Sequence, residues 1–569
     1  MSSSRKFRCW FAFALIGGLS GLALIAQQDT EPVLRVTSRL IQVSVVAQDK
    51  NGNPVRDLTR DDFTISDDNH PQKISVFSLD VAEPVTVATP RQGLTASGGI
   101  QAPLVVANRA LEPEEKRMGV TVIVLDALNL GSTDDFVYAR KQLLEFLKTL
   151  QPGDPVALYS INGPQVLLIH DFTDDASDLI QVARTLSSPK IDQEAGASPV
   201  TFAGDPSMSN IGGDPHFAAI ASKLMQASQA DAATKARITT EWTFTALESI
   251  ARHLTGIPGR KNMIWISSGY PMNIGLNPEA FAAASGAGVN QELFGYSDRT
   301  DRIARLLGEA EVVVYPVDPG GVRTDHVYRA SNNGRPSNGR FITAGEKAAP
   351  QTATIRAIAR QTGGIAYVNN AIAKNIREAV DDGRITYTIG FYPSQAAWDG
   401  KYHSLKVTVN RPGVEVRTRA GYFAKSIAEL PPEREHALRL AVSSPLEGEA
   451  IGVKVTVPSN PLGWASQDLA VTIDPRDLRF EAKDGRMQSG VDVVFAQQAQ
   501  DGHIVKGEQK SISFNLTPDK YQDGMKNGLA LPEKLWVERD ASRVHVVVRD
   551  TATGAVGSVS VPIRRTAQP

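Results

Sequence analysis

The chain has 569 residues, of which 42% are hydrophobic and 21% charged, and this composition is typical of a soluble globular protein with several domains. Its formal net charge is −2 and no basic stripe carries interleaved aromatic residues, so no nucleic-acid partner is expected. The nine histidines are scattered and Cys9 is the one cysteine, so neither a metalloprotease motif nor a paired-cysteine zinc site is indicated.

The first 26 residues have the pattern of a targeting segment. Basic residues between positions 5 and 8 precede an apolar run that ends at Ala26. A positive flank, an apolar centre and small residues near the end are typical of a secretory signal peptide. We therefore expect residues 1–26 to be removed after Ala23 or Ala26, with an uncleaved anchor as the alternative. The mature protein is then exported to the periplasm, the cell envelope or the extracellular space, with no further membrane span.

Short alternating runs follow the signal peptide. Residues 31–79 alternate apolar and polar side chains, and Asn51-Gly52 marks a tight turn between two of the runs. This pattern predicts a small β-sandwich module. Residues 80–116 are rich in Pro, Ala, Gly and Ser, which predicts a linker.

Strands and helices are expected to alternate from residue 120 to about 392. Runs such as "VTVIVL" and "NMIWIS" are apolar throughout, as in parallel strands that are buried on both faces. The alternation predicts an α/β fold class, with a doubly wound, mainly parallel sheet between N-terminal and C-terminal β-sandwich modules. The domain is expected to span 117–425, with insertions at 188–230 and 320–350 and an antiparallel β extension at its end.

The last part of the chain is again predicted to be β-rich. A Pro-Pro break at 431–432 precedes short alternating runs such as "IGVKVTV" and "RVHVVVRD". Turns separate these runs at short spacing. The pattern predicts a second, larger β-sandwich over residues 432–569.

The order of these runs resembles a known family. "VTVIVLD", "LQPGDPVALYSI", "VLLIHDFTDD" and "GRKNMIWISSG" are similar to the successive motifs of von Willebrand factor type A (VWA) domains. Together with "VVVYPVD", "YTIGFYP" and "VEVRTRAGYF", they resemble the VWFA-related proteins found widely in Acidobacteria. The resemblance extends from about residue 33 to 425. It implies a VWA-type sheet with a ligand site at its carboxyl edge.

The resemblance also implies a metal-ion-dependent adhesion site (MIDAS) at that edge. Such a site holds Mg²⁺ through an Asp-x-Ser-x-Ser loop, a threonine and a second aspartate. Asp126 matches the first aspartate, at the end of the strand "VTVIVL". The remaining positions match poorly, because leucines replace both serines and hydroxyls replace the Thr-Asp pair of the third loop. These replacements are Leu128, Leu130, Ser267 and Ser268, and the second-loop threonine is either Thr240 or Thr243.

One carboxylate with scattered hydroxyls is a poor set of ligands for magnesium, which needs near-octahedral oxygen coordination. We therefore expect a degenerate site with no cofactor, in which a divalent metal such as Mg²⁺ is not favoured. The weak metal candidates are Asp126, Asn129 and Thr243. Asp126 is instead expected to anchor a loop at a helix N-terminus.

The predicted function is non-enzymatic protein binding or adhesion by a secreted protein, with an unknown protein partner. The recognition face would comprise Asp126, Asn129, His170, Ser267, Ser268 and Asp318. A structural or assembly component of the bacterial cell envelope is the first alternative. An enzyme of unknown chemistry is the least favoured alternative, because the sequence supplies no activated nucleophile and no complete metal set, and no catalytic residue is predicted.

Overall fold

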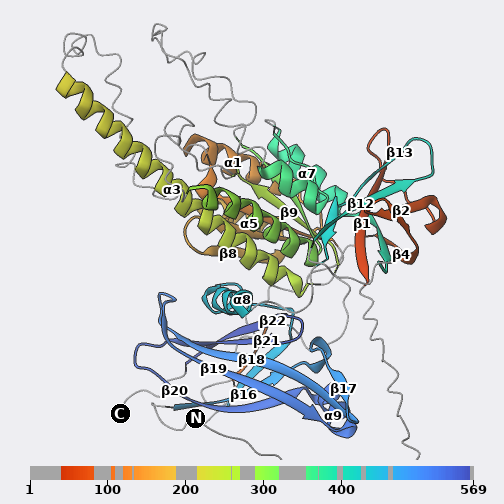
Figure 1. The fold of residues 1–569 in the computed structure, drawn as a ribbon, viewed down its shortest axis with the longest axis vertical. Coiled ribbons are helices and arrows are strands. Elements are labelled where there is room, and N and C mark those ends of the chain that lie inside the picture. Colours follow the sequence, from red (N-terminus) through yellow and green to blue (C-terminus); the bar gives the residue numbers. More distant parts are fainter. Residues whose placement is uncertain are drawn as a thin grey trace, which may run out of the picture. The chain divides into compact units, whose positions relative to one another are not determined.

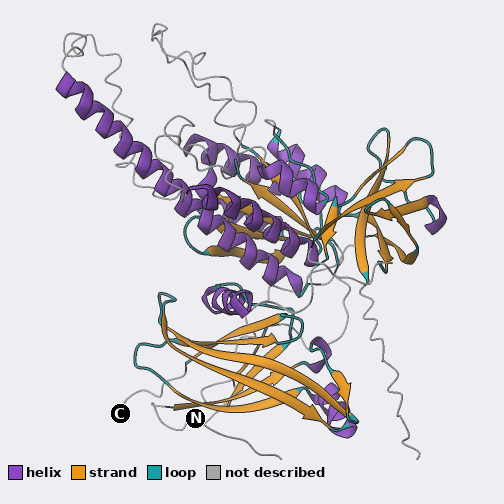
Figure 2. Ribbon diagram, viewed as in Figure 1, coloured by secondary structure: helices purple, strands orange, loops and turns teal. Residues whose placement is uncertain are grey.

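The computed structural model describes residues 40–81, 104–108, 119–130, 133–187, 215–257, 259–269, 289–319, 354–368, 371–393, 401–424, 431–458 and 466–563. The predicted signal peptide at 1–26 lies outside these residues, as do 320–350 and positions 188–214 of the other predicted insertion. Residues Leu40–Pro569 form one compact unit (Figure 1, Figure 2). None of the helices described is long and apolar enough to cross a membrane.

A five-stranded sheet forms the core of the region between residues 120 and 317. Its strands, in spatial order, are β10 (Val312–Val317), β9 (Lys261–Ile266), β6 (Val120–Asp126), β7 (Val156–Ile161) and β8 (Val166–Thr173). The first four strands are parallel to one another, and all their residues are buried. Continuous burial explains why these runs are apolar throughout, since neither face of the sheet meets water.

Helices cover the two faces of this sheet. One face packs against α1 (Thr133–Leu147), α2 (Ala176–Thr185) and α7 (Ile372–Asp382). The other face packs against α3 (Pro215–Thr255) and α5 (Val289–Glu309). Because successive strand residues point to opposite faces, Val122 and Val124 join the second set of helices, whereas Ile123 and Leu125 join the first. α3 starts within the predicted insertion at 188–230.

The prediction of an α/β fold class with a doubly wound, mainly parallel sheet is wrong. Four of the five sheets in the described chain are antiparallel, and they hold 17 of its 22 strands. Even in the sheet around β6, the edge strand β8 is antiparallel to β7. Only residues 162–165 join these two strands, and a parallel connection needs a dozen or more residues. The buried apolar runs dominated the sequence pattern, but most strands come from the alternating segments.

The N-terminal β-module is composite. Its two antiparallel sheets have the strand orders β13-β1-β11-β4 and β14-β12-β2-β3, so strands from before residue 82 alternate with strands from after residue 384. The early strands are β1 (Ile41–Asp49), β2 (Phe63–Asp67), β3 (His70–Gln72) and β4 (Ile74–Val81). The late strands are β11 (Ile385–Phe391), β12 (Tyr402–Val409), β13 (Val414–Arg417) and β14 (Gly421–Phe423).

This arrangement differs from the predicted boundaries. Residues 31–79 were expected to form a module alone, and the strands after 384 to extend the domain at 117–425. Instead, the two sets of strands share one apolar core, which includes Val43, Ile65, Ile389 and Val407. Periodicity identifies a strand but not its partner, and here the partners lie more than 300 residues apart.

The C-terminal region has two antiparallel sheets around a common apolar core. The first sheet contains β20 (Leu529–Trp536), β16 (Ser466–Ile473), β15 (Val453–Val457) and β5 (Leu104–Ala107). The second contains β17 (Glu481–Lys483), β18 (Arg486–Gln498), β19 (Ile504–Leu516), β21 (Arg543–Asp550) and β22 (Val556–Pro562). Two helices, α8 (Pro431–Ser443) and α9 (Pro518–Asn527), interrupt the strands. β5 lies inside the predicted linker at 80–116, because its apolar residues pair with β15.

Candidate functional site

Asp126 is the last residue of β6 and is fully buried. Three side-chain donors converge on its Oδ2: Nδ2 of Asn129 at 2.8 Å, the hydroxyl of Ser267 at 2.9 Å and Nε1 of Trp265 at 3.2 Å. Its other oxygen, Oδ1, is buried and has no hydrogen-bond partner within the described residues. The carboxylate is therefore held by one oxygen, in a site without water-exposed surface.

Burial also changes the acidity of this group. Removal from water raises the pKa of Asp126 from 3.8 to about 6, because the charged form loses its hydration. The hydrogen bonds from Asn129, Ser267 and Trp265 act in the opposite direction and limit the rise. Asp126 is consequently ionised at neutral pH, and it takes up a proton in mildly acidic solution.

The hydrogen bonds continue from Asp126 into neighbouring segments. Nδ2 of Asn129 also donates to the hydroxyl oxygen of Thr243 on α3 at 2.6 Å, and that hydroxyl donates to the carbonyl of Thr239. The backbone amide of Ser268 donates to the carbonyl of Asn129 at 3.2 Å. These contacts connect the turn after β6 with α3 and with the turn after β9.

The turn after β10 joins the same network. The hydroxyl of Ser268 donates to Oδ1 of Asp318 at 2.8 Å, and the amide of Asp318 donates to the carbonyl of Tyr367 at 2.9 Å. Both Ser268 and Asp318 are buried. Three successive loops at the carboxyl edge of the sheet are thus fixed to one another around Asp126.

The structure brings most of the predicted site residues together. The hydrogen-bonded network contains Asp126, Asn129, Thr243, Ser267, Ser268 and Asp318. Of the two candidate threonines, Thr243 bonds to Asn129, whereas Thr240 is also buried on α3 but no bond joins it to this network.

His170 does not belong with them. It lies within β8, opposite Leu158 of β7, and its Nδ1 is 2.6 Å from the carbonyl of Asp171. The prediction placed it at the carboxyl edge because a parallel strand was expected there. Since β8 runs antiparallel to β7, its last residues are at the amino edge of the sheet.

Trp265 is a member of the network that the sequence patterns did not suggest. It lies opposite Val124 in the pairing of β9 with β6, two residues before Asp126 and therefore on the same face of the sheet. Only knowledge of this register could have identified it, because no motif marks a tryptophan in an apolar run.

The residues at this site do not fit a magnesium ion. Mg²⁺ needs about six oxygen ligands near 2.1 Å, but an amide nitrogen lies between Asp126 and Thr243. Leu128 and Leu130, at the positions of the two serine ligands, pack against the apolar clusters on opposite faces of the sheet. The arrangement can hold loops in place, but it offers no oxygen cage for a divalent ion.

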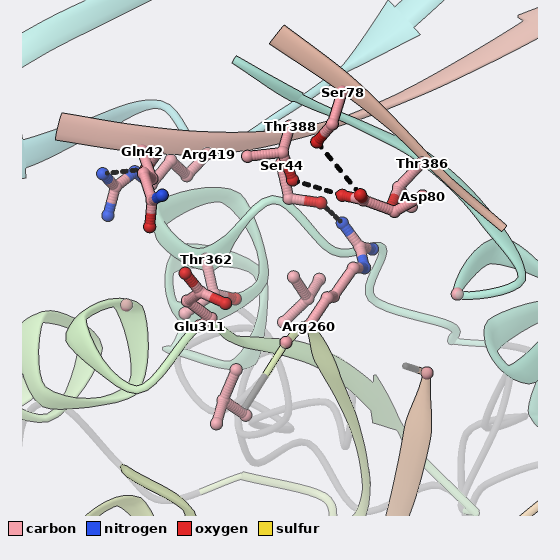
Figure 3. A pocket seen from close by; sticks show the side chains of 16 residues that line it. Gln42, Ser44, Ser78, Asp80, Arg260, Glu311, Thr362, Thr386, Thr388 and Arg419 are labelled. Atoms are coloured by element: carbon pink, nitrogen blue, oxygen red, sulfur yellow. Dashed lines mark hydrogen bonds between the residues drawn. The ribbon is translucent and has the colours of Figure 1, made fainter. Parts of the chain in front are cut away.

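A polar cavity of about 330 Å³ lies at a different place, near the start of β9 and β10 (Figure 3). Arg260 extends across it and donates to the hydroxyls of Ser44 and Tyr315, at 2.9 and 2.8 Å. On another wall, Asp80 accepts hydrogen bonds from Ser78 and Thr388. These charged groups bond to the cavity walls, so the space has room for water or a small polar molecule without a free charge from either group.

Comparisons with known proteins do not identify the chain. No family model matches it, and no curated protein matches it. Among solved structures, it is similar at a low level to the pilus adhesin SpaC from Lactobacillus rhamnosus GG, with 9% identity and a TM-score of 0.23. That alignment covers 80% of this chain and 57% of the adhesin, so the chain spans little more than half of the adhesin's length. A similarity this low carries no argument about function, and the resemblance to VWA domains stays a prediction.

Proposed function

We propose that the protein is a non-enzymatic binding protein whose recognition surface is the carboxyl edge of the sheet around β6, and that it works there without a metal ion. One observation carries the proposal: the loops after β6, β9 and β10 are fixed to each other around the buried carboxylate of Asp126. A surface on fixed loops loses little entropy when it binds a partner.

The hydrogen bonds also argue against catalysis at this edge. The hydroxyl of Ser267 donates to Asp126, and that of Ser268 donates to Asp318, so neither is aligned with a histidine that could activate it. His170, the histidine expected nearby, lies within β8. The proposed role of the network is therefore to shape a surface for a protein partner.

A photo-crosslinking experiment tests this proposal with an internal control. Asp134 and Lys148 are both exposed, and they lie at the two ends of α1, next to the carboxyl and amino edges of the sheet respectively. A photoreactive amino acid is introduced at one or the other position of the full chain, which is then illuminated with an envelope fraction of the producing cells.

The proposal predicts a discrete cross-linked protein from position 134, unchanged by EDTA, and no such product from position 148. Equal products from both positions, or none from position 134, would contradict a binding surface at the carboxyl edge. If EDTA removes the product, binding needs a metal and the metal-free account of the edge is wrong.

A further inference from the structure

A second cluster of polar side chains lies in the N-terminal β-module, away from Asp126. β2 ends at Asp67, the next residue is Asp68, and His403 is on the neighbouring strand β12. Nδ1 of His403 lies 3.3 Å from Oδ1 of Asp67 and 3.2 Å from Oδ2 of Asp68. All three ligand atoms are within 4.8 Å of one another.

Each carboxylate is oriented by a hydrogen bond to its other oxygen. The hydroxyl of Tyr422 donates to Oδ2 of Asp67 at 2.8 Å, and the backbone amide of Ser404 donates to Oδ1 of Asp68 at 2.8 Å. Burial and the neighbouring Asp67 raise the pKa of Tyr422, so its hydroxyl keeps its proton and remains a donor. The ring of Tyr422 also stacks on that of His403, with centroids 5.3 Å apart. The two remaining oxygens are thus directed at the imidazole nitrogen.

One of these oxygens has an unmet electrostatic need. Asp67 is only 6% exposed, and its Oδ1 has no hydrogen-bond partner within the described residues, although Nδ1 of His403 is close. A buried carboxylate oxygen without a donor is costly, because it has lost its water and gained nothing in return. A cation between the three ligand atoms would satisfy it.

We propose that Asp67, Asp68 and His403 form a binding site for a divalent transition-metal ion, with Zn²⁺ as its best occupant. Metal–ligand bonds of about 2.1 Å at tetrahedral or octahedral angles separate neighbouring ligand atoms by about 3.0–3.4 Å. The two separations from Nδ1 of His403 lie in that interval. One imidazole nitrogen with two carboxylate oxygens favours zinc over magnesium and calcium, which prefer oxygen alone.

The bonds from Tyr422 and Ser404 are those that a metal site uses to orient its ligands, since outer-shell donors fix each carboxylate. Asp68 and Asn69 have positive φ, at 45° and 66°, and form the turn between β2 and β3. A metal here would fasten that turn to β12, which is more than 300 residues later in the chain. The expected role is structural, and it is independent of binding at the carboxyl edge.

Calorimetric titration of the metal-depleted, untagged full chain with Zn²⁺ tests the proposal. We expect one saturable site per chain, with no displacement by millimolar Mg²⁺. Asp68→Asn and His403→Gln should each weaken binding at least tenfold. The first variant is expected to fold, because asparagine tolerates positive φ and its side-chain oxygen can still accept from Ser404.

His503→Gln is the matched control. His503 lies 2.6 Å from Oδ1 of Asp501 in an exposed turn, so this variant removes a histidine beside an aspartate without touching the cluster. Its zinc affinity should equal that of the unmodified chain, and X-ray absorption should show a nitrogen–oxygen shell that includes imidazole. No saturable binding by the unmodified chain would overturn the proposal. Equal affinities of the unmodified chain and Asp68→Asn would do so too, and the cluster would then be an imidazolium–carboxylate ion pair.

Discussion

Asn129 faces Asp126 across the turn that follows β6, with its amide nitrogen 2.8 Å from Oδ2 of the carboxylate. The same nitrogen lies 2.6 Å from the hydroxyl oxygen of Thr243. A neutral amide thus bridges a carboxylate and a threonine hydroxyl, two groups that the resemblance to VWA domains would assign to a metal. This relationship is the basis of the metal-free account of the carboxyl edge.

Asn129→Asp should convert the edge into a metal-dependent one. The change places a second carboxylate against Asp126, and two such groups repel each other unless a proton or a cation lies between them. We expect the variant to melt several degrees below the unmodified chain in EDTA, and to recover most of that loss in millimolar Mg²⁺. Calorimetric melting with and without Mg²⁺ measures both effects. A variant as stable as the unmodified chain in EDTA would show that the amide is not needed at this position.

Asp126→Asn should remove a pH dependence of stability. Because the pKa of Asp126 is 3.8 in the unfolded chain and about 6 in the folded one, the folded state binds more protons between these values. Its free energy of unfolding therefore falls as pH rises through this window, by on the order of 2–3 kcal/mol. Asparagine keeps an acceptor for the three donors on Oδ2 but carries no charge.

Hydrogen exchange of the segment 119–130 at several pH values, corrected for intrinsic rates, measures this difference locally. Protection in the unmodified chain should fall relative to Asp126→Asn between pH 4 and 7. Asp126→Ala, which removes the acceptor of all three bonds, should lose about 1–3 kcal/mol at every pH. Parallel pH profiles for the unmodified chain and Asp126→Asn would show that the carboxyl group has an ordinary pKa.

Tyr422→Phe should weaken zinc binding by about tenfold, the usual effect of losing a bond that orients a ligand. Its hydroxyl donates to Oδ2 of Asp67, so Tyr422 acts by positioning a proposed ligand. Zinc titration reports this change directly. The rings of Phe391 and Tyr422 are in contact, and a phenylalanine at 422 preserves that packing. A variant with unchanged zinc affinity would remove Tyr422 from the proposed site.

Residues 40–82 should not fold alone. In the structure β1 lies between β11 and β13, and β2 is bonded to β12, so the isolated segment loses the partners of both strands. Its circular dichroism should be that of an unfolded chain. Val81 and Ile385 are directly opposite each other, so a two-residue Asn-Gly turn can join 40–81 to 385–424 as a control. The joined chain should recover the strand signal, whereas strand signal in 40–82 alone would contradict the composite module.

The position and burial of Asp126 could be predicted because an apolar run of constant character ends there, and such runs are strands buried on both faces. His170 could not be placed in the same way. Its location depends on whether β8 is parallel or antiparallel to β7, and that is decided by a four-residue connection, not by the strand itself. The fold class was misjudged for a related reason, since periodicity does not tell which strands pair.

The cluster around His403 was beyond reach of the sequence. His403 stands in the alternating run "KYHSLKV", where its polar character suggests exposure, yet it is buried against Tyr422. Asp67 and Asp68 are ordinary residues for the end of a strand and a turn. These residues come together only because β2 pairs with β12, and no local pattern announces a contact over such a separation.

Thermal unfolding of the unmodified full chain in EDTA and in millimolar Mg²⁺ tests the metal-free carboxyl edge most directly. An ion that binds only the folded state adds about 2.7 kcal/mol at a hundred times its Kd, which would raise the melting temperature by several degrees. Because the Asn129 amide lies where an ion would need oxygen ligands, we predict a change of less than about one degree. A rise of several degrees in Mg²⁺ that disappears in Asp126→Ala would contradict the account.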